Sequence, residues 1–390
     1  MDRRDFVRGM CLGGLATFAL PAVRFAQVPG DGRLVFLLLR GGVDGLAALV
    51  PAHDPAYARA RRGLALPDEA LTDLDGRFAL GPGLEPLAEL WNRDELLAVH
   101  ALAIPYRSRS HFDSQAVLET GLDVPSGAAD GWLNRLLGVM GGEARGVAVA
   151  AGMPRSLTGP ASVSTWSPTR LGSVGGAYLD RLALLYRRDR ELHDRFEAAL
   201  QMKELAGDEG DTMGPRGPGL AARYAAVMDA TARFLAQPDG PNVAAVEFSG
   251  WDTHAAQGGA DGPLARRLGG LAQALADFPE RMGDRWRDTT VVVMTEFGRT
   301  VAVNGSGGTD HGTGGAAFVL GPRVRRSMVV ADWPGLADAE LFEGRDVRPT
   351  LDTRALLKGV LAGTFDLTAG QADRVFPESG GVRGRYDLMT

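Results

Sequence analysis

Short, continuous apolar segments constrain the fold of this chain more than any other feature. They cover residues 34–39, 96–102, 146–151, 243–248, 289–294 and 316–320. Continuous apolar runs of this length are typical of strands buried on both faces, as in parallel sheets. Helical patterns lie between them, most clearly over residues 264–278, where leucines recur every three or four positions. This alternation predicts a doubly wound α/β fold, with a largely parallel sheet flanked by helices.

Acidic residues and histidines directly follow three of these predicted strands. Asp44 follows the run at 34–39, Asp252 and His254 follow the run at 243–248, and Glu296 follows the run at 289–294. Because open α/β sheets build their sites beyond the carboxyl ends of the strands, we expect these side chains to meet at one edge. Carboxylates and imidazoles together suit a divalent metal ion.

A further acidic residue and histidine, Asp310 and His311, lie in the glycine-rich segment 304–315. Ordering so many glycines costs conformational entropy, which favours a bound ligand or ion that organises the loop. The alternative is a disordered surface loop. We expect His311 to bind the same metal ion, with Asp310 as a further ligand or as a hydrogen-bond partner behind one.

Each motif also has a purely structural interpretation when it is taken singly. Asp44, which is flanked by glycines, is then best explained as a turn residue that binds its own backbone. Asp252 and His254 fit a buried polar turn equally well. Glu296, three residues before Arg299, suggests a simple salt bridge.

A serine and two arginines precede another helical pattern. Arg107, Arg109 and Ser110 come just before or at the start of the pattern over residues 110–118, so Ser108 or Ser110 is expected at a helix N-terminus. There, backbone N–H groups and the arginines favour an anion such as phosphate or sulfate. Ser110 is therefore a candidate nucleophile. An N-cap serine is the alternative, and the more common role for a single serine in this setting.

The composition is that of an ordinary globular protein. The 390 residues are 45% hydrophobic and 23% charged, with a net charge of −6. No basic face stands out, which argues against a nucleic-acid partner. No dinucleotide fingerprint or phosphate-loop motif is present, so nucleotide binding is not indicated. We predict one α/β domain over residues 28–390, with a mostly helical insertion at about 121–235.

Residues 1–27 have the features of a targeting segment. An Arg-Arg-Asp-Phe motif begins at Arg3, and the apolar stretch 10–22 that follows is too short to span a bilayer. The sequence therefore predicts a periplasmic or secreted protein, exported by the twin-arginine machinery, without a stable membrane span. The alternative is an N-terminal surface helix. Cys11 is the sole cysteine, so the mature chain would have no disulfide and no cysteine ligand.

Six motifs, in order, resemble those of one exported bacterial family. They are the twin-arginine start, Arg-Gly-Gly-Val-Asp-Gly-Leu, Ser-His-Phe-Asp-Ser-Gln, Gly-Trp-Asp-Thr-His-Ala-Ala-Gln, Thr-Glu-Phe-Gly-Arg-Thr and Gly-Thr-Asp-His-Gly-Thr-Gly-Gly. The chain resembles the family called domain of unknown function 1501 over nearly all of its mature length. That family is similar to the alkaline phosphatase and sulfatase superfamily, whose members hydrolyse phosphate or sulfate esters at one or two divalent metals.

This resemblance implies a role for each matching position. Asp44 resembles the metal carboxylate after the first strand, and Ser110 falls where the superfamily has its nucleophile. Asp252 and His254 resemble an acidic-histidine pair that holds one metal, and His311 resembles the late histidine that completes the site.

One position departs from the superfamily pattern. Glu296 stands where the superfamily often has Asp followed by His or Asn, but here the next residue is Phe297. This change removes one expected ligand from the second site, so the resemblance implies one metal ion, or a weakened second one.

We therefore predict a metal-dependent hydrolase that cleaves a small anionic phosphate or sulfate ester. The cofactor would be one or two divalent ions, Zn, Ca, Mg or Mn. The predicted metal ligands are Asp44, Asp252, His254, Glu296, Asp310 and His311. Ser110 would be the nucleophile, with Arg109 and Arg299 neutralising the developing charge. One alternative is a non-catalytic periplasmic binding or assembly protein with a partly degenerate metal site, which Phe297 favours. Another is a structural metal ion that only orders the glycine-rich loop.

Overall fold

The computed structural model describes most of the chain beyond the predicted targeting segment. The described residues are 31–125, 127–142, 144–168, 176–187, 189–206 and 219–390. The segment 1–27 lies outside them. In the described part of the chain, no helix combines the length and apolar character needed to cross a membrane.

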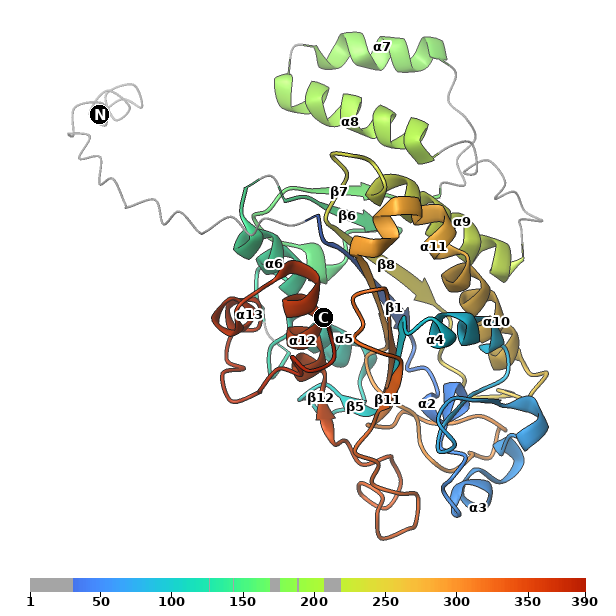
Figure 1. Cartoon of the computed structure of the whole chain (residues 1–390). Helices are drawn as coiled ribbons and strands as arrows, with labels where there is room; N and C mark the ends of the chain where they lie inside the picture. Colours follow the sequence, from blue (N-terminus) through green and yellow to red (C-terminus); the bar gives the residue numbers. More distant parts are fainter. Residues whose placement is uncertain (1–30, 126, 143, 169–175, 188, 207–218) are drawn as a thin grey trace, which may run out of the picture.

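A nine-stranded sheet forms the centre of the molecule (Figure 1). Its order is β11-β5-β10-β9-β1-β8-β6-β7, with β12 paired to β5. The strands are β1 (Arg33–Arg40), β5 (Leu96–Ala103), β6 (Gly146–Val149), β7 (Val163–Trp166), β8 (Val243–Ser249), β9 (Thr289–Met294), β10 (Gly315–Leu320), β11 (Met328–Val330) and β12 (Leu351–Asp352). Neighbouring strands are parallel except at β10, which is antiparallel to both β9 and β5. The predicted α/β fold is confirmed, and each of the six apolar runs contains a strand of this sheet.

Side chains of the central strand β1 alternate between two hydrophobic cores. Val35 and Leu37 belong to one core, whereas Leu34 and Phe36 belong to the other. This follows from the period of two along a strand. All four side chains are at most 1% exposed. Burial on both faces explains why residues 34–39 form an unbroken apolar run.

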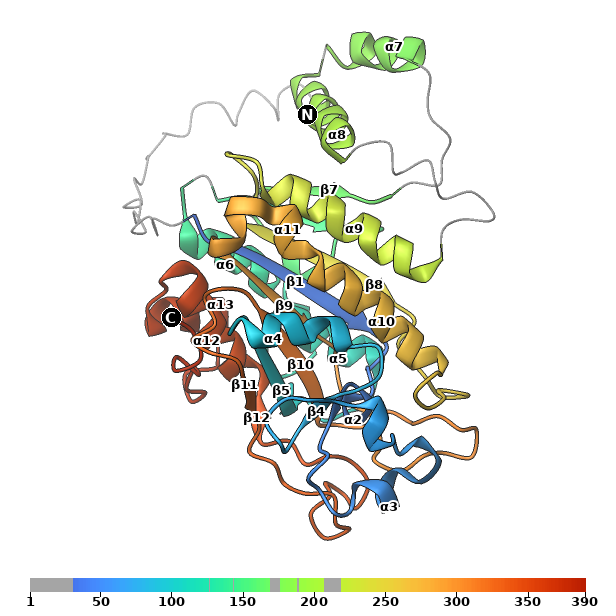
Figure 2. The same ribbon diagram turned by 45° about the vertical axis from the view of Figure 1, so that its right-hand side comes forward.

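Helices cover both faces of the sheet (Figure 2). The first core includes side chains of α4 (Ala88–Asn92), α9 (Leu220–Leu235), α10 (Pro263–Ala276) and α11 (Phe278–Met282). The second includes side chains of α5 (His111–Thr120), α6 (Trp132–Met140), α12 (Thr353–Phe365) and α13 (Ala369–Val375). In α10 the predicted apolar face is buried, from Leu264 to Leu275.

Smaller elements complete the described chain. They are α2 (Gly45–Ala48), α3 (Tyr57–Arg61), α7 (Gly176–Tyr186) and α8 (Arg190–Ala206), a small sheet of β2 (Leu49–Val50), β4 (Ala79–Leu80) and β3 (Thr72–Asp73), and the 3₁₀ turns η1 (Arg62–Leu64), η2 (Asp68–Ala70), η3 (Glu85–Leu87), η4 (Arg155–Leu157) and η6 (Gly283–Asp288).

The stretch 121–235, for which the sequence suggests a mostly helical insertion, also supplies strands. β6 and β7 form one edge of the central sheet, and α6 and α9 pack on its opposite faces. The helices α7 and α8 lie beyond that edge (Figure 1). Part of this stretch is therefore integral to the sheet.

The connections that carry the polar motifs meet at one edge of the sheet. Residues 41–45, 250–257 and 295–300 follow the parallel strands β1, β8 and β9. Because β10 is antiparallel to β9, the glycine-rich connection between them begins and ends at the same edge. The segment between β5 and α5 also leaves β5 at its carboxyl end. The topology therefore gathers these motifs where open α/β sheets build their sites.

Candidate metal centre

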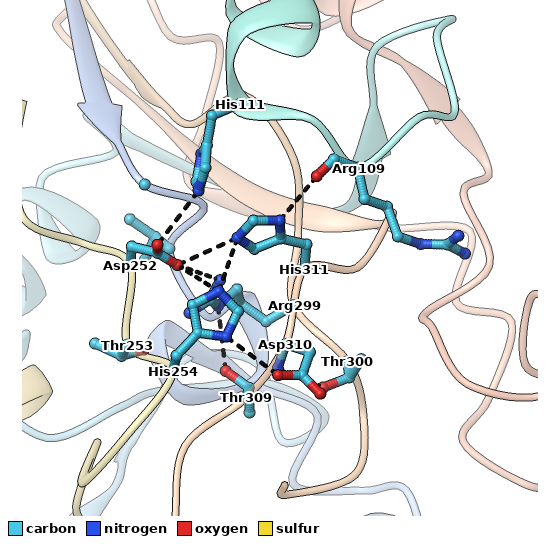
Figure 3. A network of polar contacts seen from close by, with 12 residues as sticks. Arg109, His111, Asp252, Thr253, His254, Arg299, Thr300, Thr309, Asp310 and His311 are labelled. Carbon is cyan, nitrogen blue, oxygen red and sulfur yellow. Dashed lines mark hydrogen bonds and ion pairs between the residues drawn. The ribbon is translucent and has the colours of Figure 1, made fainter. Parts of the chain in front are cut away.

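Three histidines and one aspartate meet at the carboxyl edge of the sheet (Figure 3). His111, Asp252 and His311 each offer a ligand atom, and these atoms lie within 4.8 Å of one another. His254 adjoins them, because its Nε2 atom is 2.9 Å from Nε2 of His311 and 3.2 Å from Oδ1 of Asp252. We call these four residues the His/Asp cluster.

Asp252 lies at the centre of the His/Asp cluster. Its Oδ1 is 3.4 Å from Nε2 of His311, and its Oδ2 is 3.4 Å from Nε2 of His111. The four side chains are between 24% and 44% exposed. The cluster is therefore open to solvent, and a small ligand can reach it.

Two of the imidazoles, whose Nε2 atoms face the cluster, are oriented by carboxylates that contact their Nδ1 atoms. Nδ1 of His111 is 2.8 Å from Oε1 of Glu296, and Nδ1 of His254 is 3.1 Å from Oδ1 of Asp310. Ionised carboxylate oxygens only accept hydrogen bonds, so each Nδ1 carries a proton and donates it. In the neutral ring, the lone pair is then on Nε2, the atom that faces the cluster.

The third imidazole is oriented by the backbone. Nδ1 of His311 is 2.8 Å from the carbonyl oxygen of Arg109, which can only accept. The Nε2 lone pair of His311 is therefore also directed into the cluster. An acceptor behind each imidazole is the arrangement that fixes the tautomer of metal-binding histidines.

The chemistry of these atoms suits a divalent ion, and His111, Asp252 and His311 form the group whose ligand atoms lie close enough together to share one. Ligand atoms around a tetrahedral zinc ion, each about 2.0–2.1 Å from the metal, lie roughly 3.3 Å apart. The three contacts of Asp252 with the histidines and the contact between His254 and His311 range from 2.9 to 3.4 Å, and the ligand atoms of His111, Asp252 and His311 all lie within 4.8 Å of one another. Two Nε2 lone pairs so close together repel each other unless a cation or a proton lies between them. Imidazole donors favour zinc, whereas calcium and magnesium prefer oxygen.

Neighbouring groups keep the carboxylates of the site ionised. Burial opposes ionisation of Asp252, but the guanidinium of Arg299, with Nη1 2.7 Å from Oδ1, brings its pKa below the usual range. Burial also opposes ionisation of Glu296, yet hydrogen bonds from His111 and Gln115 lower its pKa. The hydrogen bond to Glu296 raises the pKa of His111. The site therefore carries negative charge that suits a cation.

Glu296, a predicted metal ligand, lies behind His111 instead of facing the cluster. Its Oε1 accepts hydrogen bonds from the backbone of Gly41 at 2.9 Å, from His111 and from Nε2 of Gln115 at 2.9 Å. Its side chain is completely buried. The structure therefore places this carboxylate where it orients an imidazole. Asp310, also a predicted ligand, occupies the matching position behind His254.

Asp44, the third predicted carboxylate, is outside the His/Asp cluster. Its Oδ1 accepts the N–H of Leu46 at 3.1 Å and so caps α2. Its Oδ2 accepts hydrogen bonds from Arg61 and, at 2.7 Å, from Nε2 of Gln257. The Arg61 side chain is fully buried, and a buried guanidinium needs a carboxylate partner. Pairing with Arg61 is thus the physical reason that Asp44 does not join the cluster.

The arginines predicted to neutralise charge are themselves paired. Arg109 contacts Asp346 at 2.8 Å and Glu343 at 2.5 Å. Arg299 has a fully buried side chain and holds Asp252. Both arginines therefore act on protein carboxylates in this structure, and Arg109 serves the cluster through its backbone carbonyl.

Ser110 occupies the N-cap of α5, as in the alternative interpretation. Its Oγ accepts the N–H of Asp113 at 3.5 Å. It lies between Arg109, whose carbonyl binds His311, and His111 of the cluster. The serine is therefore next to the cluster in the chain, with a long capping hydrogen bond.

His111 is the cluster residue that the sequence interpretation missed. A signal was present, because His111 follows the predicted strand at 96–102 and begins a helical pattern, as expected of a residue at this edge. Phe297 packs against it, with ring centroids 4.8 Å apart, and lies at the same distance from His311.

Close backbone contact orders the glycine-rich loop that carries His311. The N–H of Gly312 donates to the carbonyl of Gly298 at 2.8 Å. A Cβ at Gly312 would lie 2.4 Å from the carbonyl carbon of Arg299, so no larger residue fits. This pairing sets His311 opposite Arg299.

Solved structures of the alkaline phosphatase superfamily are similar to this chain at low identity. A superfamily member from Vibrio parahaemolyticus has 13% identity and a TM-score of 0.39, over 78% of this chain and 63% of that one. The lipoteichoic acid synthase LtaP of Listeria monocytogenes has 12% identity and a TM-score of 0.38, over 78% and 69%. Alkaline phosphatase from the Antarctic bacterium TAB5 has 11% identity and a TM-score of 0.31, over 77% and 95%. This chain therefore spans less than two thirds of the Vibrio protein, and these similarities concern the fold alone.

Sequence comparison gives the family. No curated protein matches the sequence. The family model described as "Protein of unknown function (DUF1501)" matches residues 91–377, which is well over half of the chain. The chain therefore belongs to the DUF1501 family.

Proposed function

We propose that this protein is an exported, metal-dependent hydrolase that uses water to cleave phosphate or sulfate esters into an alcohol and the free anion. The observation that carries the proposal is the convergence of three imidazole Nε2 atoms on the carboxylate of Asp252. The resemblance of its motifs to those of the phosphatase and sulfatase superfamily supports the choice of ester.

The His/Asp cluster would hold one divalent ion, and its donors suit zinc best. When bound, such an ion supplies Lewis-acid polarisation of the ester oxygen. Phe297 packs on His111 and His311 and offers no donor atom where the resemblance leads us to expect a second ligand. We therefore propose one ion in place of two.

Ser110 is the nucleophile that we propose. It lies at the N-terminus of α5, beside His111, where the helix dipole favours an anionic ester. Its capping hydrogen bond is 3.5 Å long, so the hydroxyl is weakly held. Arg299 would contribute by fixing Asp252, to which it is already bonded.

A non-catalytic binding or assembly protein is the second candidate. Phe297 in a position expected to hold a ligand favours it, and so does the engagement of Arg109 by Asp346 and Glu343. Such a protein would bind a metal and an anion without turnover.

Activity measurements on the purified, zinc-loaded protein distinguish the two candidates. The substrates are a panel of aryl phosphates and aryl sulfates. We expect Asp252→Ala and His311→Ala each to lower kcat/KM by roughly 100-fold or more, because each removes a group that stabilises the transition state through the ion. His53→Ala is the matched control, since His53 is an exposed imidazole outside the cluster.

Ser110→Gly then tests the nucleophile, with Ser108→Gly as the control for an exposed serine nearby. Replacement of an N-cap serine by glycine lowers helix stability by only a few tenths of a kcal/mol, roughly, so α5 should stay folded. We expect Ser110→Gly to retain zinc and lose turnover. Hydrolase function is excluded if no ester is cleaved with zinc, manganese, magnesium or calcium. Full activity in Asp252→Ala would exclude the His/Asp cluster as the site of hydrolysis.

A further inference from the structure

A cavity of about 410 Å³ lies beside the His/Asp cluster. Its walls come from residues 59–62, 300–304 and 336–345, together with Asp310. Ligand pockets have volumes of roughly 300–1,000 Å³, so a small organic anion fits this one. We call it the arginine pocket, because Arg59, Arg62 and Arg345 are among its lining residues.

The arginine pocket and the His/Asp cluster share a wall. Asp310 lines the pocket and accepts the hydrogen bond from Nδ1 of His254. Asn304 also lines it, and its Nδ2 donates to Asp310 at 3.0 Å and to the carbonyl of His254 at 2.9 Å. Figure 3 shows Asp310 on the side of the cluster away from His111. A ligand in the pocket would therefore lie next to groups that orient the cluster.

A second contact joins the pocket to the cluster. Nη2 of Arg345 donates to the carbonyl of His311 at 2.9 Å. This bond anchors one pocket arginine to the backbone of a cluster residue.

The charges around the pocket favour an anion. Its lining residues include three arginines and two aspartates, Asp310 and Asp338, in a chain whose net charge is −6. One of the arginines, Arg345, already has Nε 3.4 Å from Oδ1 of the buried Asp346. Asp310 is engaged by Asn304 and His254. Asp338 is 96% exposed and 3.8 Å from Arg59, so this pair contributes little in water.

Arg62 differs from the other two pocket arginines in its pairing and in its backbone conformation. Among the described residues it has no ion-pair partner. Its φ is 47°, a left-handed conformation that residues with a Cβ rarely adopt. Backbone strain of this kind persists where surrounding structure enforces it, and it is frequent at binding sites. The free guanidinium is therefore available to a ligand.

We propose that the arginine pocket binds a phosphate or sulfate group of the ligand, so that the substrate class is an ester with a second anionic group. The assignment of the substrate class rests on the proposed function, whereas anion binding in the pocket does not. Guanidinium groups bind phosphate and sulfate through parallel N–H···O bonds. The reacting group would lie at the cluster, and the second group would lie across the wall formed by Asp310 and Asn304.

Calorimetric titration of the zinc-loaded protein with inorganic phosphate, and separately with sulfate, tests the pocket. The double variant Arg59→Gln/Arg62→Gln is compared with Arg287→Gln, an exposed arginine outside the pocket. Both are also made in a His311→Ala background, where the cluster is broken. We expect the double variant to raise the dissociation constant about tenfold or more in both backgrounds, because charged hydrogen bonds are lost. Arg62→Lys should recover part of the affinity.

Three results overturn anion binding in the pocket. The first is no binding of either anion by the unmodified protein. The second is complete loss of binding in His311→Ala, which would assign the anion to the cluster. The third is equal affinity in the double variant and Arg287→Gln. None of these measurements involves turnover. Anion binding in the pocket can therefore be refuted while the proposed hydrolase function stands, and the reverse is also possible.

Turnover tests the substrate class. For an ester with two anionic groups, Arg59→Gln/Arg62→Gln should raise KM about tenfold and leave kcat unchanged, because the lost binding is equally strong in the ground state and in the transition state. For an ester with one anionic group, KM should not change. An equal rise in KM for both esters would contradict the assignment of the second group to the pocket.

Discussion

At the scale of single residues, the orientation of the imidazoles decides whether the His/Asp cluster can bind a metal. Glu296 and Asp310 are placed behind two histidines, and a backbone carbonyl is placed behind the third. Each acceptor fixes a proton on Nδ1 and leaves Nε2 free to bind. In the proposed site, the carboxylates would therefore contribute to metal affinity without touching the ion.

Glu296→Gln tests this positioning role. Glutamine can still accept the hydrogen bond from His111 but carries no charge, so we expect zinc affinity to fall by about 10–100-fold. Competition with a chromophoric chelator measures the dissociation constant. Glu95→Gln is the matched control, because Glu95 also accepts a side-chain hydrogen bond, from Trp286 at 3.1 Å, but precedes β5 at the opposite edge of the sheet. Equal zinc affinity in the two variants would contradict the role of Glu296.

Sequence patterns were sufficient to predict that Asp252, His254 and His311 lie together, because each belongs to a segment at the carboxyl edge of a strand. They could not separate a metal ligand from the acceptor behind it, since Glu296 occurs at the same kind of position. They also could not predict the pairing of Asp44 with Arg61, which depends on how the turn after β2 folds back.

At the scale of secondary structure, the reversed direction of β10 is what brings His311 to the cluster. The connection from β9 to β10 stays at one edge, and its two sides pair closely at Gly298 and Gly312. A parallel β10 would have required a crossover to the other end of the sheet. The position of His311 is therefore determined by the glycine-rich loop and by the direction of β10, the strand that follows the loop.

Gly312→Ala tests the importance of this close pairing. The added Cβ would lie 2.4 Å from the carbonyl carbon of Arg299, so the two sides of the loop must separate. We expect zinc affinity to fall at least about tenfold, because the groups that accept hydrogen bonds from the histidines lose their alignment. The far-ultraviolet circular dichroism spectrum should not change. Gly305→Ala is the control, because a Cβ there meets nothing within 4 Å. Wild-type zinc binding by Gly312→Ala would show that the loop adapts.

Long buried strands could be predicted from the sequence, whereas short edge strands could not. β11 and β12 have three and two residues, which is too few for an apolar run or a period to be visible. β7 lies at the sheet edge and has two consecutive exposed polar residues, Ser164 and Thr165, so it lacks the unbroken apolar pattern of the centre.

At the scale of the whole molecule, two hydrophobic cores hold the sheet rigid and keep the cluster at its edge. Cluster residues come from segments far apart in the chain, at 111, 252–254 and 311, and only the sheet brings them together. Many apolar residues specify the sheet redundantly, which is why the fold could be predicted from patterns. The site depends on a few hydrogen bonds between distant segments, and no local pattern encodes these.

The central claim is that the Nε2 atoms of three histidines, together with Asp252, bind one divalent ion. The most direct measurement is the zinc X-ray absorption spectrum of the protein loaded with one equivalent of zinc. We expect nitrogen and oxygen ligands at about 2.0–2.1 Å, with outer scattering from three imidazole rings. In His254→Ala the imidazole contribution should fall to two rings. A spectrum of hydrated zinc, or one that shows a single imidazole ring, would contradict the claim.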